Sequence, residues 1–485
     1  MIFAFSDLIV FLPQRAKQTV LTGQTLLMSE PSNTTQGGYT RPAFVHQGNA
    51  SFTEVNSLTT FTEGHEETEA LQPIADVDFH KLLEPFDKND YAGKIIQAIF
   101  DLDMEAPSRV QCQVVPLLLD DAKNSLIAQA QSGSGKTLSF LVSALMCLDK
   151  NVDKPQVICL SNTRELAMQT LECFEALNLY FNWKHHLSVK NPPQPKEGKN
   201  NGDKNAKIVF GTPASVNFDI KGNKIDVSAI KMIIIDEADE LLLPQATQKR
   251  DLITLLNMFK DKAQLAFFSA TFPPSIRENI KTFKPNFLEI VIKRVEQVST
   301  IKHFYTRCPR DDKVQLICNM FDALSFKKAF IFVNSKKNAP LVQSALHNKG
   351  IKAEFFSSEL SAEKRDETLS LFKTGETDVI VATNVLARGI DVPDTTLVVN
   401  FELPIIIIEN HKQEGIQKKL RRTDIDMYVH RAGRTGRFGK KGACISIIES
   451  EHDYDLRRIE DIRKQTNLEI KEIVTSEFNK LESSQ

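Results

Sequence analysis

The 485-residue chain has few cysteines and no pairing pattern among them. Its seven cysteines are scattered, and none forms a Cys-x-x-Cys pair, which argues against a zinc ribbon or a disulfide framework and is typical of a reducing compartment. The chain also lacks a run of roughly 20 apolar residues, the length that crosses a bilayer. We therefore expect a soluble protein without membrane insertion.

An excess of charge of either sign is also missing. Sixty Lys and Arg stand against 62 Asp and Glu, for a formal net charge of -2. This balance excludes a uniformly basic, histone-like binder, although a local basic groove could still bind nucleic acid. The length allows two or three domains, because single cores usually stop growing at about 250 residues.

The N-terminal region lacks sustained periodicity. Residues 14–75 are rich in Thr, Ser, Gly, Gln and Glu, so we predict a disordered tail over residues 1–75. The apolar run Leu8–Leu12 is short and has no basic leading region, unlike a secretory signal. Met1 and Met28 both stay open as translation starts.

From Phe79 onward, short apolar runs alternate with longer amphipathic stretches, and the rhythm occurs twice. This pattern predicts an α/β fold with two lobes, each a parallel sheet with crossover helices. We place the lobes at residues 76–293 and 300–470, with a linker at 294–299 and a C-terminal tail at 471–485. Insertions are expected at Asn191–Lys207 and Ile405–Asp426. The predicted strands are Leu126–Ala128, Val157–Leu160, Ile208–Phe210, Met232–Ile235, Leu265–Phe268, Ala329–Val333, Ala353–Phe356, Val379–Ala382, Thr396–Asn400 and Ala443–Ile448.

A loop of small residues follows the first predicted strand and precedes a helical stretch. Its backbone N–H groups can wrap phosphate oxygens, and the helix N-terminus adds a favourable dipole. Lys136 would then contact the β and γ phosphates, while the Thr137 hydroxyl would ligate Mg²⁺. A chance glycine-rich turn is disfavoured by the flanking strand and helix. The candidate phosphate-binding residues are Ala130, Gln131, Ser132, Gly133, Ser134, Gly135, Lys136 and Thr137.

The fourth predicted strand, Met232–Ile235, is followed by the acidic string Asp236-Glu237-Ala238-Asp239. A buried parallel strand delivers its last residues to the ligand crevice. Asp236 would bind Mg²⁺ through water, and Glu237 would orient or deprotonate the attacking water. An acidic helix cap explains the string alone equally well. The phosphate loop upstream favours the catalytic interpretation.

These residues resemble the motifs of the DEAD-box RNA helicases of superfamily 2, a family that takes its name from the string Asp-Glu-Ala-Asp. Further segments resemble family motifs in family order: Thr163–Ala167 (Ia), Gly211–Pro213 (Ib), Ser269–Thr271 (III), Phe332–Ser335 (IV), Ala382–Asp391 (V) and His430–Arg437 (VI). The resemblance implies two tandem RecA-like domains and an ATP-dependent RNA helicase that uses ATP and Mg²⁺.

The resemblance also implies residue roles. Catalysis falls to Lys136, Asp236, Glu237 and the arginine fingers Arg434 and Arg437. ATP is further held by Gln111 at adenine and by Gly389 and Asp391, the latter at the ribose. Ser269, Thr271, Asp239, His430 and Arg431 couple the lobes, the last two toward the γ-phosphate and motif III. RNA is expected to bind through its phosphates and sugars, without strong sequence preference. The residues that would contact it are Arg164, Gly211 and Thr212 on lobe 1 and Arg365, Thr383 and Arg388 on lobe 2.

The adenine-reading element departs from the family pattern. Phe86 and Gln111 stand at the family spacing, and the Gln111 amide offers both a donor and an acceptor to adenine. Met104 replaces the aromatic residue that stacks on the base. A thioether still packs on a ring face, so we predict weakened adenine affinity with retained ATP preference.

Other features narrow the resemblance to the helicases of messenger-RNA export at the nuclear pore. They are Pro155–Leu160, Gln169–Glu172, a missing Gly-Gly doublet and the insertion at 405–426. This branch implies a monomer, located in cytoplasm and nucleus at the cytoplasmic face of the pore, with a nucleoporin and a release activator as partners. The insertion carries five cations that either lie on a solvated loop or contact RNA or an acidic partner. They are Lys412, Lys418, Lys419, Arg421 and Arg422.

Other functions stay open at the level of sequence. A DEAD-box helicase of translation initiation or ribosome assembly would share the chemistry and differ in partners. A catalytically slow, ATP-dependent RNA clamp would keep RNA binding without turnover, although intact Lys136, Glu237, Arg434 and Arg437 argue against it. A DNA helicase is disfavoured by the motifs of lobe 1.

Overall fold

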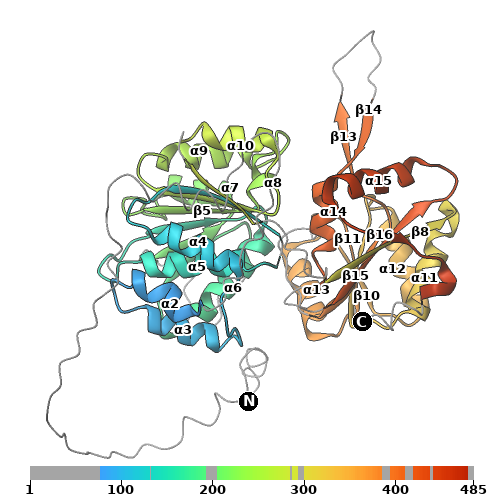
Figure 1. Cartoon of the computed structure of the whole chain (residues 1–485), viewed down its shortest axis with the longest axis horizontal. Helices are drawn as coiled ribbons and strands as arrows, with labels where there is room; N and C mark the ends of the chain where they lie inside the picture. The colour runs from blue at the N-terminus through green and yellow to red at the C-terminus, as the bar shows by residue number, and fades with distance from the viewer. Residues whose placement is uncertain are drawn as a thin grey trace, which may run out of the picture.

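The computed structural model describes residues 77–131, 133–192, 205–284, 287–292, 300–384, 394–409, 419–436 and 441–478. Two lobes lie side by side, and each contains a seven-stranded parallel sheet flanked by helices (Figure 1). This architecture confirms the predicted fold class. The predicted tail at 1–75 and linker at 294–299 fall outside the described residues. No helix in the described ranges has the length and apolar character to cross a membrane.

Lobe 1 follows the predicted alternation of strands and helices. Its strands are β1 (Ser125–Ala130), β2 (Val157–Leu160), β3 (His185–Ser188), β4 (Ile208–Gly211), β5 (Met232–Asp236), β6 (Gln264–Ser269) and β7 (Phe287–Ile292). Its α-helices are α2 (Phe79–Leu83), α3 (Ala92–Phe100), α4 (Arg109–Leu119), α5 (Lys136–Cys147), α6 (Arg164–Leu177), α7 (Pro213–Lys221), α8 (Ala238–Leu242), α9 (Lys249–Phe259) and α10 (Pro274–Lys281), with 3-10 turns at Glu84–Phe86 and Asn178–Tyr180.

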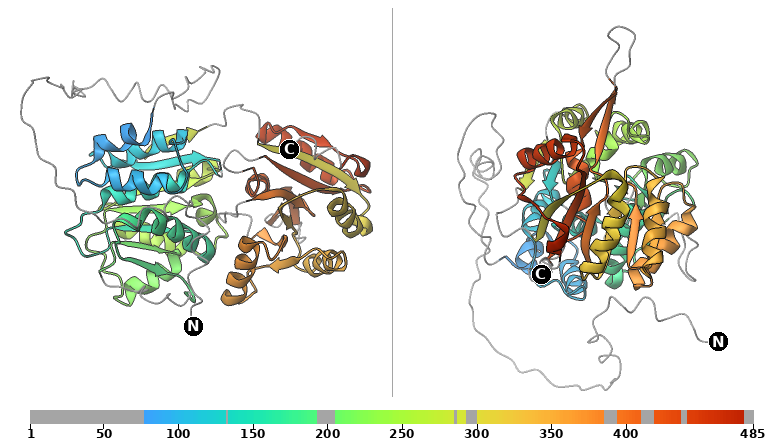
Figure 2. Two further views of the ribbon diagram at one scale, coloured as in Figure 1. Left: turned by 90° about the horizontal axis from the view of Figure 1, so that it is seen from below. Right: turned by 90° about the vertical axis from the view of Figure 1, so that its right-hand side faces the viewer.

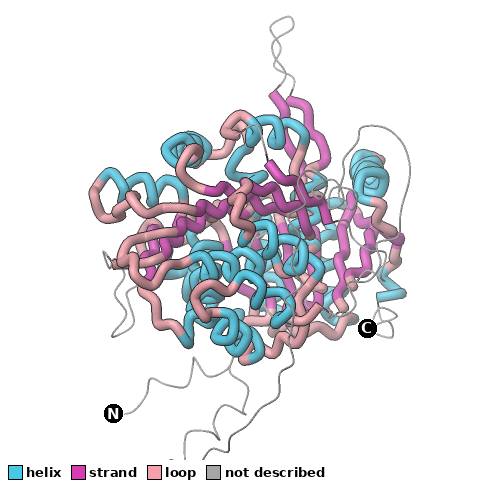
Figure 3. Tube along the Cα trace, turned by 60° about the vertical axis from the view of Figure 1, so that its left-hand side comes forward, coloured by secondary structure: helices cyan, strands magenta, loops and turns pink. Residues whose placement is uncertain are grey.

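The central strands of lobe 1 are apolar at successive positions because helices cover both faces of the sheet (Figure 3). Successive side chains of β2 enter two different core layers. Val157 packs in the layer that contains helix α5, whereas Ile158 packs in the layer that contains helix α9. This alternation is the period of two that a strand imposes.

The strand order of lobe 1 is β3-β4-β2-β5-β6-β1-β7. Strands β5, β6 and β1 are therefore neighbours, and their carboxyl ends meet at one edge. Asp236 pairs with Phe268, and Gln129 pairs with Ser269. Ligands of open parallel sheets bind beyond such carboxyl ends, so the topology brings the phosphate loop, the acidic string and motif III together.

Lobe 2 repeats the parallel design with the order β10-β11-β9-β12-β15-β8-β16. Its strands are β8 (Ile301–Cys308), β9 (Lys328–Phe332), β10 (Ala353–Phe356), β11 (Val379–Ala382), β12 (Thr395–Asn400), β15 (Gly442–Glu449) and β16 (Ile470–Glu472). Its helices are α11 (Lys313–Ala323), α12 (Asn338–Asn348), α13 (Ala362–Thr374), α14 (Ile425–Ala432) and α15 (Tyr454–Thr466), after a 3-10 turn at Arg310–Asp312.

The predicted end of lobe 2 at residue 470 is wrong. Strand β16 pairs with β8 over Ile470–Glu472, and Ile473 and Phe478 are buried in the lobe 2 core. The lobe therefore continues at least to Phe478. The sequence Ile-Lys-Glu is too short and too polar to show a strand period, so only its pairing identifies it.

The insertion at 405–426 forms an antiparallel hairpin, β13 (Ile405–Glu409) and β14 (Lys419–Thr423), before helix α14 begins. The hairpin projects away from lobe 2 (Figure 1). Its cations Lys412 and Lys418 lie outside the described residues, as does most of the predicted Asn191–Lys207 insertion. Every strand predicted from sequence is present, whereas β3, β7, β8, β16 and the hairpin were not anticipated.

Candidate nucleotide and RNA site between the lobes

The predicted phosphate loop joins β1 to helix α5. Gly133 and Gly135 adopt φ values of 74° and 96°, which favour glycine. A Cβ on Gly135 would also lie 2.7 Å from Gln111 Nε2 and 2.8 Å from Ser108 Oγ. The Lys136 ammonium donates to the carbonyls of Ala130 at 2.5 Å and Gln131 at 3.0 Å, so it sits within the loop.

One further feature suits this loop to an anion. The Ser134 hydroxyl is buried and has no hydrogen-bond partner among the described residues. A buried polar group without a partner is costly, and a phosphate oxygen would satisfy it. Ser132 lies outside the described residues.

Gln111 ties helix α4 to the phosphate loop. It forms a capping box with Ser108: its Oε1 accepts from the Ser108 N–H at 2.7 Å, and its own N–H donates to Ser108 Oγ at 3.3 Å. Its Nε2 reaches the Gly135 carbonyl at 3.5 Å. Met104 and Phe86 are partly buried against the same lobe 1 core. The adenine contact of Gln111 stays a prediction.

Asp236 and Glu237, the first two of the three carboxylates in the acidic string, are buried at the end of β5. The Asp236 carboxylate accepts from the Glu237 N–H at 3.0 Å. Desolvation, with a smaller repulsion from Glu237, raises the pKa of Asp236 to about 7, while Lys136 opposes the shift. Glu237 adopts φ +50°, and its buried Oε2 has no hydrogen-bond partner within the described ranges. Such desolvated carboxylates beside a phosphate loop fit a hydrated divalent cation. The other predicted ligand, Thr137, is partly buried and follows Lys136 in the phosphate loop.

His430 of lobe 2 lies against the carboxylates of Glu237 and Asp239 in lobe 1. Its Nδ1 is 3.9 Å from Glu237 Oε2, and its Nε2 is 3.7 Å from Asp239 Oδ2. Both distances exceed a hydrogen bond, and both ring nitrogens are buried without a partner in the part of the chain described. The trio Glu237, Asp239 and His430 could also hold a metal ion.

Motif III continues this contact inside lobe 1. Thr271 Oγ1 donates to Asp239 Oδ2 at 2.7 Å, and the Thr271 N–H donates to Ser269 Oγ at 3.3 Å. Four of the five residues predicted to couple the lobes therefore form one cluster: Ser269, Thr271, Asp239 and His430.

The predicted coupling of Arg431 toward the γ-phosphate and motif III needs correction. Its guanidinium is fully buried within lobe 2 and donates to Asn384 Oδ1 at 2.5 and 3.0 Å and to Asn334 Oδ1 at 2.8 Å. It also donates to Asn400 Oδ1 at 3.1 Å and to the Glu402 carbonyl at 2.8 Å. Desolvation lowers the pKa of Arg431 to about 9. Arg431 thus positions the motif loops of its own lobe.

Sequence reasoning missed Asn334, Asn384 and Asn400 as the partners of Arg431. Asn334 and Asn384 belong to the quoted motif IV and motif V segments, which was the available signal. Of the finger residues, Arg434 is buried and its Nε donates to the His430 carbonyl at 3.1 Å. Arg437, Arg388, Gly389 and Asp391 lie outside the described residues.

Two of the predicted RNA-facing residues of lobe 1 adjoin at the end of β4. A Cβ on Gly211 would lie 2.2 Å from the Ser188 carbonyl, so only glycine fits there. Thr212 is buried and precedes helix α7. In lobe 2, Thr383 is half-buried, and its N–H donates to the Phe356 carbonyl at 3.3 Å.

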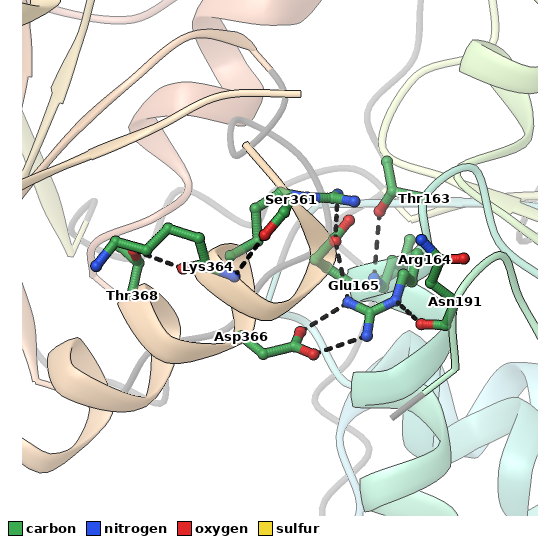
Figure 4. Close-up of polar contacts among 10 residues, drawn as sticks. Thr163, Arg164, Glu165, Asn191, Ser361, Lys364, Asp366 and Thr368 are labelled. Carbon is green, nitrogen blue, oxygen red and sulfur yellow. Dashed lines mark hydrogen bonds and ion pairs between the residues drawn. The ribbon is translucent and has the colours of Figure 1, made fainter. Parts of the chain in front are cut away.

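The predicted RNA arginines Arg164 and Arg365 each pair with a carboxylate of the opposite lobe, and Figure 4 shows the contact of Arg164 with Asp366. Arg164 Nη1 and Nη2 each lie 2.7 Å from an oxygen of Asp366, while Arg365 pairs with Glu165. Sequence reasoning missed both carboxylates. Each carboxylate follows one of the arginines in the sequence and pairs with the other arginine across the lobes. The two dipeptides involved are Arg164-Glu165 on α6 and Arg365-Asp366 on α13.

Comparison with known proteins agrees with this geometry. Residues 108–279 match the DEAD/DEAH box helicase family, and residues 312–439 match the helicase conserved C-terminal domain. The chain is 31% identical over 390 residues to the ATP-dependent RNA helicase DBP5 of Mycosarcoma maydis, covering 80% of this chain and 81% of that protein.

Solved structures of a related protein are similar as well. The structure of S. cerevisiae Dbp5 bound to RNA and ADP BeF3 matches with 30% identity and a TM-score of 0.72, over 83% of this chain and 97% of that chain. A variant of S. cerevisiae Dbp5 bound to Nup159, Gle1, IP6 and ADP matches with 29% identity and a TM-score of 0.57, over 81% and 98%. The chain belongs to the DEAD-box family of ATP-dependent RNA helicases.

Proposed function

We propose that this protein hydrolyses ATP between its two lobes in an RNA-stimulated cycle that remodels RNA or RNA–protein complexes. The observation that carries the proposal is the approach of His430 to Glu237 and Asp239, at 3.9 and 3.7 Å. Lobe 2 thereby reaches Glu237, which is predicted to act on the attacking water, and Asp239, which is predicted to couple the lobes. ATP and RNA sites that are each divided between the lobes would make the two ligands favour the same closed state.

The environments of the predicted catalytic residues support their roles. Glu237 has a buried oxygen with no partner in the described ranges, suited to orient or deprotonate a water. Lys136 lies within the phosphate loop, where it would bind the β and γ phosphates. Arg434, with Arg437, would stabilise the charge that develops on the phosphoryl group.

Magnesium fits the same site. Asp236 and Thr137 would hold it, Asp236 through water, and a bound Mg²⁺ would supply charge neutralisation of the phosphate oxygens. Asp236 suits this part because its carboxylate is desolvated at the edge of the sheet. Gln111, Gly389 and Asp391 would hold the base and ribose.

The RNA partner would be single- or double-stranded and read without strong sequence preference. Arg164, Gly211 and Thr212 on lobe 1 and Arg365, Thr383 and Arg388 on lobe 2 would contact phosphate and sugar. Loss of the γ-phosphate contacts after hydrolysis would let the lobes separate and RNA leave.

Messenger-RNA export is the process that we infer for this activity. The similarity to Dbp5 supports it, since a Dbp5 variant has been solved with Nup159, Gle1 and IP6. A nucleoporin and a release activator would bind this chain likewise. The chain would act as a monomer at the cytoplasmic face of the pore and would be present in both cytoplasm and nucleus. A helicase of translation initiation or ribosome assembly would show the same chemistry without binding these partners.

ATP hydrolysis should be measured with and without single-stranded RNA, for wild type, Glu237→Gln and the control Glu278→Gln on the exposed side of α10. We expect strong RNA stimulation in wild type and the control. Glu237→Gln should lose turnover yet keep ATP-dependent RNA binding. A hydrolysis rate independent of RNA would contradict the coupled cycle, and RNA binding without any wild-type turnover would indicate a clamp. Repeating the measurement with single-stranded DNA in place of RNA tests the alternative that the protein is a DNA helicase.

A further inference from the structure

Two arginine–carboxylate pairs join helix α6 of lobe 1 to helix α13 of lobe 2. The Arg164 guanidinium forms a bidentate pair with Asp366 at 2.7 Å for both contacts, and Arg365 pairs with Glu165. A third pair, Lys373 with Glu172 at 3.0 Å, lies further along the same helices. Figure 4 shows that the Arg164 fork points directly at the Asp366 carboxylate.

The Arg164–Asp366 pair is the one of these three contacts with bidentate geometry. Arg164 is 7% exposed, and its Nε donates to the Asn191 carbonyl at 3.1 Å, which orients the fork. The hydrogen bond to Asp366 is the main reason that the pKa of Arg164 is raised. Bidentate pairing on a mostly buried guanidinium is much more specific than contact between exposed charges.

A carboxylate and a phosphate present the guanidinium with the same geometry. Each offers two oxygens that match two parallel N–H groups. In this structure the terminal nitrogens of Arg164 that would bind an RNA phosphate are both bonded to Asp366. Asp366 is itself 32% exposed, so an incoming anion can reach and replace it.

We propose that Asp366 is an internal competitor of RNA: its carboxylate takes the place of an RNA phosphate on Arg164 and joins the lobes, and RNA must displace it to bind. This inference deepens the proposed function and rests on it. Two effects follow together. Asp366 weakens the apparent affinity for RNA, and it favours contact between the lobes before RNA arrives.

The test compares Asp366→Asn with wild type in the full-length chain. Asparagine keeps the size and shape of the side chain but removes the charge. Glu367→Gln is the matched control, because this substitution removes the same charge from the next position of α13. Glu367 pairs within its own helix, with Lys364 at 3.0 Å. A labelled single-stranded RNA is titrated with each protein and a non-hydrolysable ATP analogue, by fluorescence anisotropy.

We expect the half-saturating RNA concentration to fall about fivefold in Asp366→Asn, and to stay at the wild-type value in Glu367→Gln. In an Arg164→Ala background, Asp366→Asn should bring no further gain, because the competition needs the guanidinium. Small-angle scattering without RNA should show a larger radius of gyration for Asp366→Asn, since one contact between the lobes is lost.

An unchanged or raised half-saturating concentration in Asp366→Asn would overturn the proposal, since the aspartate would then be a structural or positioning group. An equal gain in Glu367→Gln would overturn it too, by reducing the effect to net charge. Failure of the proposed function looks different, because wild type and both variants would then bind no RNA at any concentration.

Discussion

Different hydrogen-bond partners give chemically identical residues different roles in this protein. Arg431 and Arg164 are both arginines of family motifs. Arg431 spends its donors on asparagine oxygens and a carbonyl within lobe 2, whereas Arg164 faces the other lobe. A buried guanidinium must be hydrogen-bonded throughout. Arg431 meets this need within its own lobe and fixes loops in place, whereas Arg164 relies on Asp366, which is 32% exposed and can be replaced.

The desolvated Asp236 carboxyl predicts a pH-dependent loss of stability. Its pKa is raised to about 7, against about 3.9 in an unfolded chain. The folded state therefore binds the proton more tightly, so this contribution to stability is fully present below about pH 4 and is lost as the pH rises through about 7.

Asp236→Asn should consequently be more stable than wild type at pH 8, by roughly 2 kcal/mol more than at pH 5. The gain would come at the expense of activity, as is common for strained sites. The measurement is urea unfolding at both pH values in the presence of a chelator. A difference between the two proteins that does not change with pH would contradict the prediction.

Met104 is the second single residue with a measurable consequence. It packs, partly buried, against the lobe 1 core, and it stands at the position predicted to stack on adenine. A flexible thioether should stack on the base less well than a ring. Met104→Phe should lower the dissociation constant of a fluorescent ATP analogue about threefold to tenfold. Met258→Phe, at an exposed position of α9, is the control. Equal binding by Met104→Phe and wild type would refute the idea.

At the scale of elements, pairing identifies segments that the sequence pattern does not. Strand β16 is short and polar but completes the edge of the lobe 2 sheet through β8. The hairpin β13–β14 is apolar on its first strand, with Ile406 40% exposed, yet it packs as a separate two-stranded sheet. Figure 2 shows it extending from lobe 2 in the right-hand view.

The segment after β16 should contribute to the stability of lobe 2. Phe478 is fully buried in that core, whereas Val474 is 52% exposed. Phe478→Ala should destabilise the protein by about 3 kcal/mol or more, because it leaves a cavity. Val474→Ala should change stability by less than about 0.5 kcal/mol. Thermal unfolding measures both. A Phe478→Ala protein as stable as Val474→Ala would restore the predicted lobe boundary at residue 470.

At the scale of the whole molecule, the described polar contacts between α6 and α13 are ionic. A net charge of -2 for the chain conceals this arrangement, because the charges are paired locally across the lobes. In each of these pairs at least one side chain is partly exposed, so salt weakens the contact. The lobes should therefore separate readily, which a cycle of closing and opening requires.

A charge exchange tests this view away from the RNA arginines. Lys373→Glu should widen the lobe arrangement in low salt, because it faces Glu172. The double variant with Glu172→Lys should restore it, since the opposite pair forms again. Small-angle scattering without ligands measures the change. The difference should shrink at about 0.5 M salt, where screening is nearly complete. A double variant that stays as open as Lys373→Glu would contradict the ionic contact.

The sequence by itself determined the two parallel-sheet lobes, the positions of the central strands and the phosphate loop with its acidic partner string. These follow from local rules, since buried strands are apolar and a phosphate loop needs small residues between a strand and a helix.

Only the tertiary structure decided the rest. It assigned Arg431 to its own lobe, added β16 to the sheet, folded the insertion into a hairpin and paired Arg164 with Asp366. The hairpin joins strands that are close in sequence, but the other three depend on partners far apart in the chain. Side-chain periodicity carries no information about which distant charge or strand a residue will meet. The contacts across the lobes belong to this class, because they exist only when two separately folded cores come together.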